Sequence, residues 1–323
     1  MNKFKPNGET FTGFPEIKES TEPEVVIFST GGGGAGKVIA STAIAKSIRD
    51  KHPNARLVVV TPHVHVYQSI GWVDEVSQAG RNPSFYERFH DSNFKWYQGE
   101  PYFHKDYISG RMHLLDAWAS ILGIERTSDP ILHLTDKEIK HAKTLFNNVK
   151  NPCILFQSEG GSAPQQNQQG QFIRQKNYER DLPPEIMQQV VNALAPEYGF
   201  AQVLRKGQTK IQGAVHIEDA DMRDLYSYVN GAQIILGIDS VVQHAAKALN
   251  KKAIVLWAAT RPQCLGYESH VNLWRKACPT PLCNRPNSFL MDTSPEGRIW
   301  SCPYGGPCAD HDVDNIISAI REY

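Results

Sequence analysis

A strand, a run of glycines, a helix and a second strand follow one another between residues 24 and 61. This order restricts the fold more than any other feature of the chain. EVVIFST and ARLVVVTP have the apolar character of buried strands. Between them, apolar residues recur at helical spacing until His52-Pro53. A strand–turn–helix–strand unit predicts parallel strands, and therefore an α/β fold.

The same alternation restarts at Asn151-Pro152 and continues through KKAIVLWAA. It predicts two Rossmann-like domains with parallel sheets, over residues 24–150 and 151–323, preceded by a loose polar arm over residues 1–23. Such domains would bind a ligand in a cleft between them, at the carboxyl ends of both sheets. The last helix, in DNIISAIREY, is expected either in the second domain or returning to the first.

Within these domains, several helices have recognisable signals. GRMHLLDAWASILGI is amphipathic, and Thr135 with Glu138 three residues later predicts a capping box at the start of the next helix. A later helix is expected to begin at Pro183 or Pro184. The aromatic and histidine-rich region over residues 71–110 has no clear periodicity and receives no assignment.

Charge and hydrophobicity narrow the class of protein. Acidic and basic residues number 34 each in a chain of 323, so the formal net charge is zero. This removes the simplest argument for nucleic-acid binding, a strongly basic surface; a local basic patch stays open, and we expect no nucleic-acid partner. No apolar run approaches the roughly 20 residues of a membrane span, and the first residues do not resemble a signal peptide. We expect a soluble cytoplasmic protein, and peripheral membrane contact stays open.

Six cysteines fit free thiols better than a disulfide framework. Four of them, Cys278, Cys283, Cys302 and Cys308, have the spacing C-x4-C-x18-C-x5-C. Zinc sites usually contain tighter C-x2-C pairs. Structural thiols or a labile pair are therefore favoured over zinc, and we expect neither a metal nor a cofactor.

The glycine run STGGGGAGKV matches the first seven positions of a nucleoside-triphosphate loop. The eighth position needs a hydroxyl for Mg²⁺, and Val38 has none. Ile234–Asp239 could pass for the strand that ends in a Mg²⁺-binding aspartate, but such strands are common. An NTPase is therefore a distant alternative. We interpret Gly33, Gly34 and Gly36 as a turn that lets the backbone approach a phosphate or oxyanion at a helix N-terminus.

From about residue 25 to residue 320, the chain resembles the bacterial ADP-heptose:lipopolysaccharide heptosyltransferases, glycosyltransferase family nine. The segment from the glycine turn to Val73-Asp74-Glu75-Val76 resembles the opening of that family. GRMHLLDAWASILGI resembles its next helix, and GIDSVVQHAAKALNKKAIVLWAATRP resembles its most specific block. This resemblance implies the GT-B fold, with two Rossmann-like domains, and a donor nucleotide sugar on the C-terminal domain.

The resemblance also implies a donor site. Asp239 and Ser240 would lie at a helix N-terminus facing the diphosphate, where unpaired N–H groups attract an anion. Val241 stands where the family has glycine. His244 matches a family histidine, and a purely structural role for it is equally open.

Further donor contacts are implied by the loop after the first strand of the second domain. Lys176 would neutralise the leaving diphosphate, and the hydroxyls of Ser158 and Ser162 would contact phosphate. The family places an acidic residue for the ribose after VLRKG, where this chain has Gln208 and Gln212.

The family's catalytic base is an aspartate directly after the turn glycine, and Lys37 stands there instead. A protonated lysine cannot accept the acceptor's proton. We expect Lys37 to act as an electrostatic group that holds phosphate, so that Lys37→Ala weakens binding of a phosphorylated ligand. The alternative local bases are Asp106, His104, His63, His65 and Glu159.

These observations predict a metal-independent glycosyltransferase that moves a sugar from a nucleotide-activated donor to a glycan or other hydroxyl acceptor. The alternative is a catalytically altered relative that binds a nucleotide sugar or glycan without efficient transfer, and the replacement at Lys37 favours it.

Overall fold

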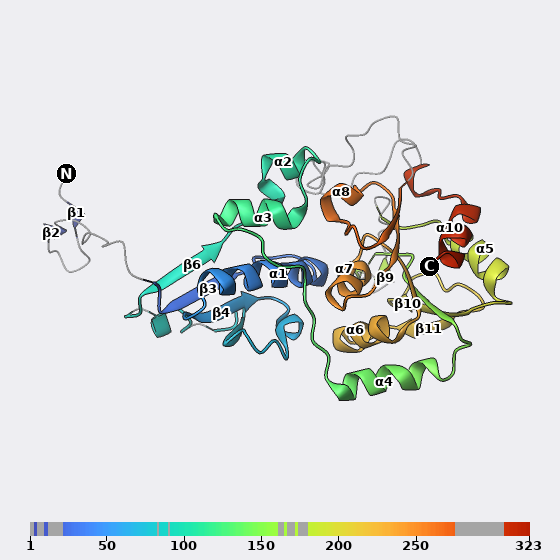
Figure 1. Ribbon diagram of the computed structural model, residues 1–323, viewed down its shortest axis with the longest axis horizontal. Helices are drawn as coiled ribbons and strands as arrows, with labels where there is room; N and C mark the ends of the chain where they lie inside the picture. The colour runs from blue at the N-terminus through green and yellow to red at the C-terminus, as the bar shows by residue number, and fades with distance from the viewer. Residues whose placement is uncertain are drawn as a thin grey trace.

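The computed structural model describes residues 22–82, 84–89, 91–160, 180–274 and 307–323. It also describes four two-residue strands, which pair as two antiparallel ribbons: β1 (Lys3–Phe4) with β2 (Thr10–Phe11), and β8 (Gln165–Gln166) with β9 (Phe172–Ile173). Most of the predicted arm over residues 1–23 lies outside these ranges. The rest of the described chain forms two parallel sheets with helices around them (Figure 1), which confirms the predicted α/β class.

The first sheet has four parallel strands in the order β5-β4-β3-β6. Their bounds are β3 Val25–Ser29, β4 Arg56–Thr61, β5 Glu75–Gln78 and β6 Phe94–Gln98. The helices of this half are α1 (Ala35–Lys51), α2 (Lys105–Ile108) and α3 (Leu114–Leu122), and the 3₁₀ turns are η1 (Val64–Tyr67), η2 (Glu87–Phe89) and η3 (Pro101–Phe103).

The second sheet has six parallel strands in the order β11-β10-β7-β12-β13-β14. Their bounds are β7 Cys153–Phe156, β10 Gly199–Leu204, β11 Val215–Glu218, β12 Ile234–Ile238, β13 Ile254–Trp257 and β14 Val271–Trp274. The elements around it are α4 (Asp136–Phe146), α5 (Pro184–Leu194), α6 (Met222–Gly231), α7 (Val241–Ala248), α8 (Pro262–Leu265), η4 (Pro307–Ala309) and α10 (Val313–Arg321).

The helix α1 lies between the two sheets and is buried on nearly every side. It packs against α3 in its own half and against α7 in the other. Its polar residues Ser41, Thr42 and Ser47 are buried, and each hydroxyl donates to a helix carbonyl. One apolar core therefore runs from Phe28 of the first sheet through α1 and α7 to Leu155 of the second.

Two helices, α4 and α10, pack with the second half. The predicted capping box is confirmed, because Thr135 accepts from the Glu138 N–H while the Glu138 carboxylate accepts from the Thr135 N–H. The helix that it starts, α4, precedes residue 151 in sequence but packs against α6 of the second half (Figure 1). The last helix, α10, packs against α5 and buries Ile316 and Ile320 against the second sheet, so it does not return to the first.

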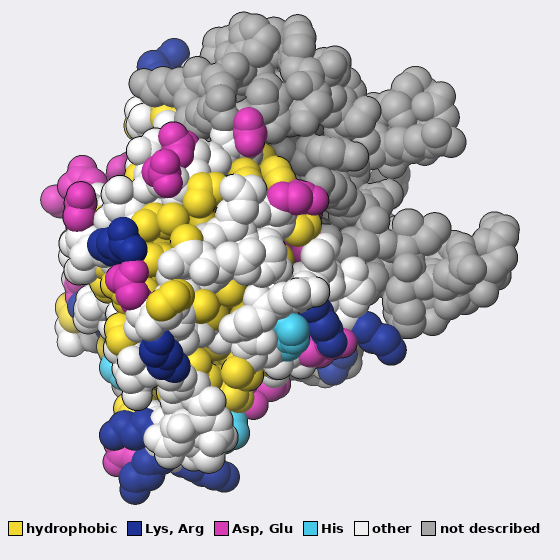
Figure 2. Space-filling view, turned by 90° about the vertical axis from the view of Figure 1, so that its right-hand side faces the viewer, with side chains coloured by type: hydrophobic (Ala, Val, Ile, Leu, Met, Phe, Trp, Pro, Cys, Tyr) yellow, Lys and Arg dark blue, Asp and Glu magenta, His cyan; other side chains and the backbone are white. Residues whose placement is uncertain are grey.

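Positive and negative side chains are mixed on the surface, in agreement with the equal numbers of acidic and basic residues. Figure 2 views the molecule from the side of the second half, and side chains of both signs occur across the described part of that face. None of the helices in the described ranges is long and apolar enough to cross a membrane.

Candidate functional site

The glycine turn follows the carboxyl end of β3, at the edge of the first sheet that faces the second half. Gly31 has a φ of +66° and Gly33 a φ of +122°, backbone conformations that favour glycine. A Cβ on Gly33 would lie 2.8 Å from the Cδ atom of Lys37. The glycines therefore create the space in which the Lys37 side chain folds back over its own turn.

The turn meets the N-terminus of α7 directly. A Cβ added to Gly36 would lie 2.7 Å from the Cδ2 atom of His244 and 3.6 Å from the Cα atom of Val241. The start of α1 and the start of α7 are thus in contact, each just after the carboxyl end of a parallel strand. This contact brings Gly36, Val241 and His244 from the two halves to one place.

Lys37 is buried and fully engaged within the first half. Its Nζ atom donates to the Gly32 carbonyl at 2.9 Å and to Glu100 Oε2 at 2.6 Å. The rings of Tyr102 and Trp118 lie 5.3 and 5.2 Å from the ammonium, and the side chain is only 3% exposed. The expected contact between Lys37 and phosphate would have to compete with these partners and stays a prediction.

This arrangement also bears on the NTPase alternative. A phosphate-binding lysine extends toward the β- and γ-phosphates. Here the ammonium turns back onto its own loop and onto Glu100, and Val38 is buried in the core. The geometry therefore lacks the two side chains on which NTP binding through such a loop depends.

On the second half, Asp239 and Ser240 follow the carboxyl end of β12. Asp239 is buried, and its Oδ2 atom lies 3.6 Å from Arg180 Nε. Ser240 is the N-cap of α7 and donates through Oγ to Gln157 Oε1 at 2.7 Å. Gln157 follows β7, the strand that pairs with β12, which explains why these side chains meet.

The remaining predicted donor residues divide in two. Ser158 lies beside this group, because it too follows β7; it is buried, and its carbonyl accepts from the Leu182 N–H at 2.9 Å. Ser162 and Lys176 lie outside the described residues. Gln208, where the resemblance implies an acid, donates to the Gly160 carbonyl and accepts from the Arg205 N–H.

His244 has protein partners at both ring nitrogens. Its Nε2 atom lies 3.2 Å from the Gln243 amide nitrogen, which can only donate, so Nδ1 carries the proton and donates to the Tyr267 hydroxyl at 2.8 Å. Burial lowers the pKa of His244 to about 4. The ring is therefore neutral near pH 7, and these bonds fix it against the glycine turn.

The alternative bases named from the sequence are mostly engaged elsewhere. Glu159 Oε1 accepts from the Thr209 N–H at 2.9 Å, and Asp106 is ion-paired with Arg111. His104 caps α2 by accepting from the Asp106 N–H. His63 lies nearest the turn, with Nε2 3.2 Å from the Gly33 carbonyl. Burial lowers the pKa of the fifth candidate, His65.

We call the contact of Gly36 with Val241 and His244, together with the side chains around it, the junction. The sequence analysis did not identify four residues of this junction: Glu100, Tyr102, Gln157 and Arg180. Glu100 follows β6, a strand in a region that received no assignment. The alternating FKWYQ at residues 94–98 is a weak strand signal that could have placed it. Tyr102 lies near residues of both halves. Burial raises the pKa of its hydroxyl to about 12; the charge of Arg180 opposes this shift, and the charges of Asp239 and Glu100 add to it.

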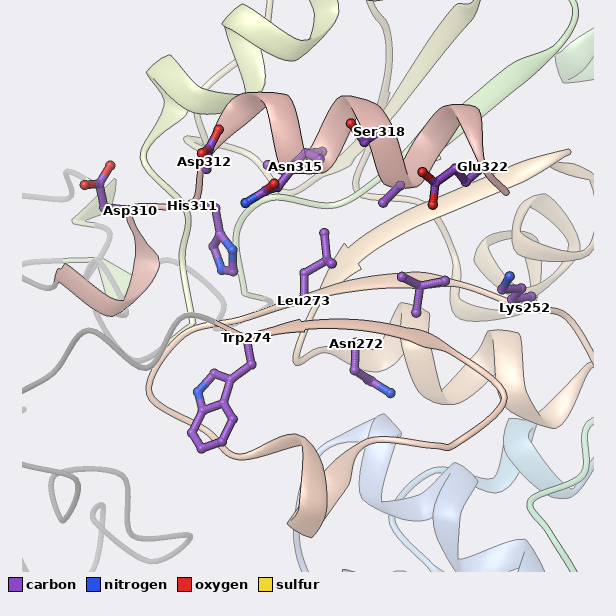
Figure 3. A pocket seen from close by; sticks show the side chains of 13 residues that line it. Lys252, Asn272, Leu273, Trp274, Asp310, His311, Asp312, Asn315, Ser318 and Glu322 are labelled. Atoms are coloured by element: carbon purple, nitrogen blue, oxygen red, sulfur yellow. The ribbon is translucent and has the colours of Figure 1, made fainter.

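No group of three or more metal-ligating side chains occurs among the described residues. Of the four tail cysteines, only Cys308 is described; it is buried with Ala258 and Ala259. A pocket of about 920 Å³ lies away from the junction, between β14 and α10 (Figure 3). Trp274 and Asn272 line it on the strand side, and Asn315 and Glu322 on the helix side.

The sequence and the structure were compared with those of known proteins, and the structural similarities identify the fold. No family model and no curated protein matches the sequence. The structure resembles a family 9 glycosyl transferase from Veillonella parvula, with a TM-score of 0.66 and 13% identity over 94% of this chain and 98% of that one. It also resembles the iron-containing dodecameric glycosyltransferase TibC from enterotoxigenic E. coli, with a TM-score of 0.66 and 12% identity over 98% and 81% of the chains.

The ADP-heptose heptosyltransferase II of E. coli superposes with a TM-score of 0.53 at 12% identity, over 79% of this chain and 91% of that one. The chain has the GT-B fold. The resemblance read from the sequence is thereby confirmed in three dimensions, and at these identities it concerns the fold.

Proposed function

We propose that this GT-B protein is a glycosyltransferase that moves a sugar from a nucleotide-activated donor to a hydroxyl acceptor, without a metal. The observation that carries the proposal is the contact between two strand ends: Gly36 of the glycine turn lies against Val241 and His244 at the start of α7. In open α/β sheets, ligands bind beyond the carboxyl ends of the strands. Both halves of this chain present those ends to each other.

The second half would bind the donor. The N–H groups at the start of α7 have no helical partners and carry the positive end of the helix dipole, which suits a diphosphate. Asp239 and Ser240 stand beside them, and Arg180 adds a positive charge. Residues 151–323 would thus form the donor domain and residues 24–150 the acceptor domain. Lys176, Ser158 and Ser162 would contribute the phosphate contacts that the sequence implies.

ADP-heptose is the donor to test first. It is present in a TibC complex whose fold this chain shares, with a TM-score of 0.62 at 11% identity. The acceptor would be a glycan or other hydroxyl compound in the cytoplasm, with peripheral membrane contact open. A nucleotide donor would reach its sugar-transfer position without Mg²⁺, because cationic side chains and helix N–H groups can neutralise the diphosphate.

The second candidate function is nucleotide-sugar or glycan binding without efficient transfer. It is favoured by one observation: the residue at the position of the family's base is Lys37, whose ammonium is held by Glu100 and Gly32. A transferase and a protein that only binds could have the same affinity for the nucleotide sugar. Only the transferase would turn it over, so binding data alone do not separate the two candidates.

A thermal-shift screen tests the shared part of both proposals. Purified protein is heated with ADP, UDP, GDP, CDP and ADP-heptose, each with Mg²⁺ and with EDTA. We expect ADP and ADP-heptose to raise the melting temperature equally in both buffers, since ligands that bind the folded state stabilise it. Release of ADP from ADP-heptose then distinguishes a transferase from a binder. A response to no nucleotide would contradict both.

A further inference from the structure

The carboxylate of Glu100, which follows β6, lies beside the glycine turn. The sequence analysis did not predict this strand. β6 pairs with β3 in parallel, with Ser29 opposite Gln98. The two chains leaving these strand ends, the glycine turn and the segment that contains Glu100, therefore emerge side by side. Lys37 and Glu100 are 63 positions apart in sequence, yet their side chains meet at 2.6 Å.

The carboxylate of Glu100 is held on one side only. Its Oε2 atom accepts from Lys37, whereas Oε1 is buried and has no hydrogen-bond partner among the described residues. Buried carboxylate oxygens are normally paired, so an unpaired one would gain a hydrogen bond from a donor that a ligand brings. A Cβ on Gly31 would lie 3.6 Å from Glu100 Oε2, an ordinary contact, so the carboxylate lies directly beside the glycine turn.

Glu100 also lies near the proposed donor site. The Tyr102 hydroxyl is close enough to Glu100, Asp239 and Arg180 for their charges to shift its pKa, so Glu100 and the donor residues share this neighbour. Glu100 is the N-cap of η3, and Tyr102 is a member of that turn. The side chain of Glu100 is 33% exposed, whereas that of Lys37 is 3% exposed. Of the ion pair, Glu100 is therefore the more exposed side chain, with Oε1 at its buried end.

We propose that Glu100 is the catalytic base of this chain and that Lys37 is its positioning residue. This inference rests on the proposed transferase function and concerns the same site. Lys37 fixes Glu100 Oε2 and leaves Oε1 to accept a hydrogen bond from the acceptor hydroxyl. The acid that the family carries on the glycine turn is thus supplied from the end of the neighbouring strand.

The transfer step balances as follows. The acceptor hydroxyl gives its proton to the Glu100 carboxylate while its oxygen forms a bond to the anomeric carbon of the donor sugar. The bond from that carbon to the diphosphate oxygen breaks, and its electron pair leaves with the nucleoside diphosphate. The protonated Glu100 afterwards returns its proton to water. Inversion at the anomeric carbon follows from attack opposite the leaving group.

The test uses the full chain with ADP-heptose as probe and water as acceptor, measuring released ADP, with ADP affinity measured separately by calorimetry. We expect Glu100→Gln to reduce ADP release by roughly 10²- to 10⁴-fold, the usual contribution of a general base, while ADP affinity stays within about twofold. Lys37→Met should reduce the rate, and Lys37→Arg should restore most of it because Arg preserves the ion pair; if Lys37 instead holds the donor's phosphate, Lys37→Met will weaken ADP binding.

A double variant that exchanges the two charges distinguishes the loss of the base from the loss of activity through misfolding. The double variant Lys37→Asp with Glu100→Lys keeps the pair but returns the acid to the glycine turn, and we expect it to release ADP faster than Glu100→Gln does. ADP release at the wild-type rate by Glu100→Gln would overturn the inference and leave the transferase proposal intact. A wild type that binds ADP but releases none from ADP-heptose would overturn the inference and favour the binder. A wild type that neither binds ADP nor hydrolyses the donor would overturn both proposals.

Discussion

At the scale of single residues, the junction depends on the absence of a side chain at Gly36. The start of α1 approaches α7 so closely that one added carbon would meet the His244 ring at 2.7 Å. Gly32 offers the contrast, because a Cβ there would meet nothing within 4 Å and its φ lies outside the left-handed region. The same loop thus contains one glycine required by packing and one that packing does not require.

Gly36→Ala should therefore lower the free energy of unfolding by about 1–3 kcal/mol, the usual effect of overpacking a closely fitted contact. Denaturant titration measures it, with Gly32→Ala as the matched control and an expected change below about 1 kcal/mol. Equal effects of the two variants would show that the contact between α1 and α7 is not as described.

Buried histidines at the same junction predict a dependence of stability on pH. Burial lowers the pKa of His244, and likewise of His113, to about 4. An unfolded histidine ionises near pH 6.5, so between pH 6.5 and about 4 the unfolded chain binds protons that the folded chain excludes. The free energy of unfolding should therefore fall as the pH drops through this window, by up to about 1.4 kcal/mol per pH unit for each histidine.

Urea titrations at pH 7, 6 and 5 measure this slope. His244→Gln should make the slope shallower, because it removes one of the two groups. His141→Gln, at an exposed position on α4, is the matched control for the substitution itself. A slope that is the same in wild type and His244→Gln would contradict the assignment of a neutral buried ring.

At the scale of elements, Arg223 of α6 joins three segments. It donates to both carboxylate oxygens of Glu138 on α4, at 2.6 and 2.8 Å, and to the carbonyls of His133 and His65. His65 belongs to η1 of the first half, so this one side chain ties α4, α6 and η1 together. Its bonds mainly hold the pKa of Glu138 down to about 2.

Arg223→Met should lower the free energy of unfolding by about 2–4 kcal/mol, because it leaves a largely buried carboxylate without its cationic partner. Arg56→Met is the control: Arg56 pairs with Glu75 on the surface, where Glu75 keeps Arg88, and we expect less than about 1 kcal/mol. Thermal unfolding of both variants decides the point. If Arg223→Met lowered the free energy of unfolding as little as Arg56→Met does, Arg223 would not stabilise the packing of α4, α6 and η1.

Elements differ in how much of them the sequence could reveal. Strands β3, β7, β12 and β13 are short apolar runs bounded by turns, and that apolar character predicted them. β6, in the region left unassigned, is half polar and lies at the edge of its sheet, where one side faces away from the core. Glu100 was therefore missed, because its partnership with Lys37 arises from strand pairing between segments far apart in sequence, which local patterns do not encode.

At the scale of the whole molecule, the two sheets contribute the two sides of one junction. The order of elements and the Asp239-Ser240 block predicted that both halves would meet at strand ends. The packing of α4 against α6 and of α10 against α5 was not predictable, since amphipathic helices reveal that they bury a face but not which partner covers it. The helices between the sheets join them through a continuous core.

The central claim is that this junction binds the diphosphate of a nucleotide sugar without a metal. Calorimetric titration of ADP into the wild type and Lys176→Ala, with Mg²⁺ and with EDTA, tests it most directly. We predict one ADP per chain with the same affinity in both buffers, weakened roughly 10- to 150-fold in Lys176→Ala, as the loss of a charge-assisted phosphate contact implies. ADP binding that requires Mg²⁺, or no ADP binding at all, would contradict the account.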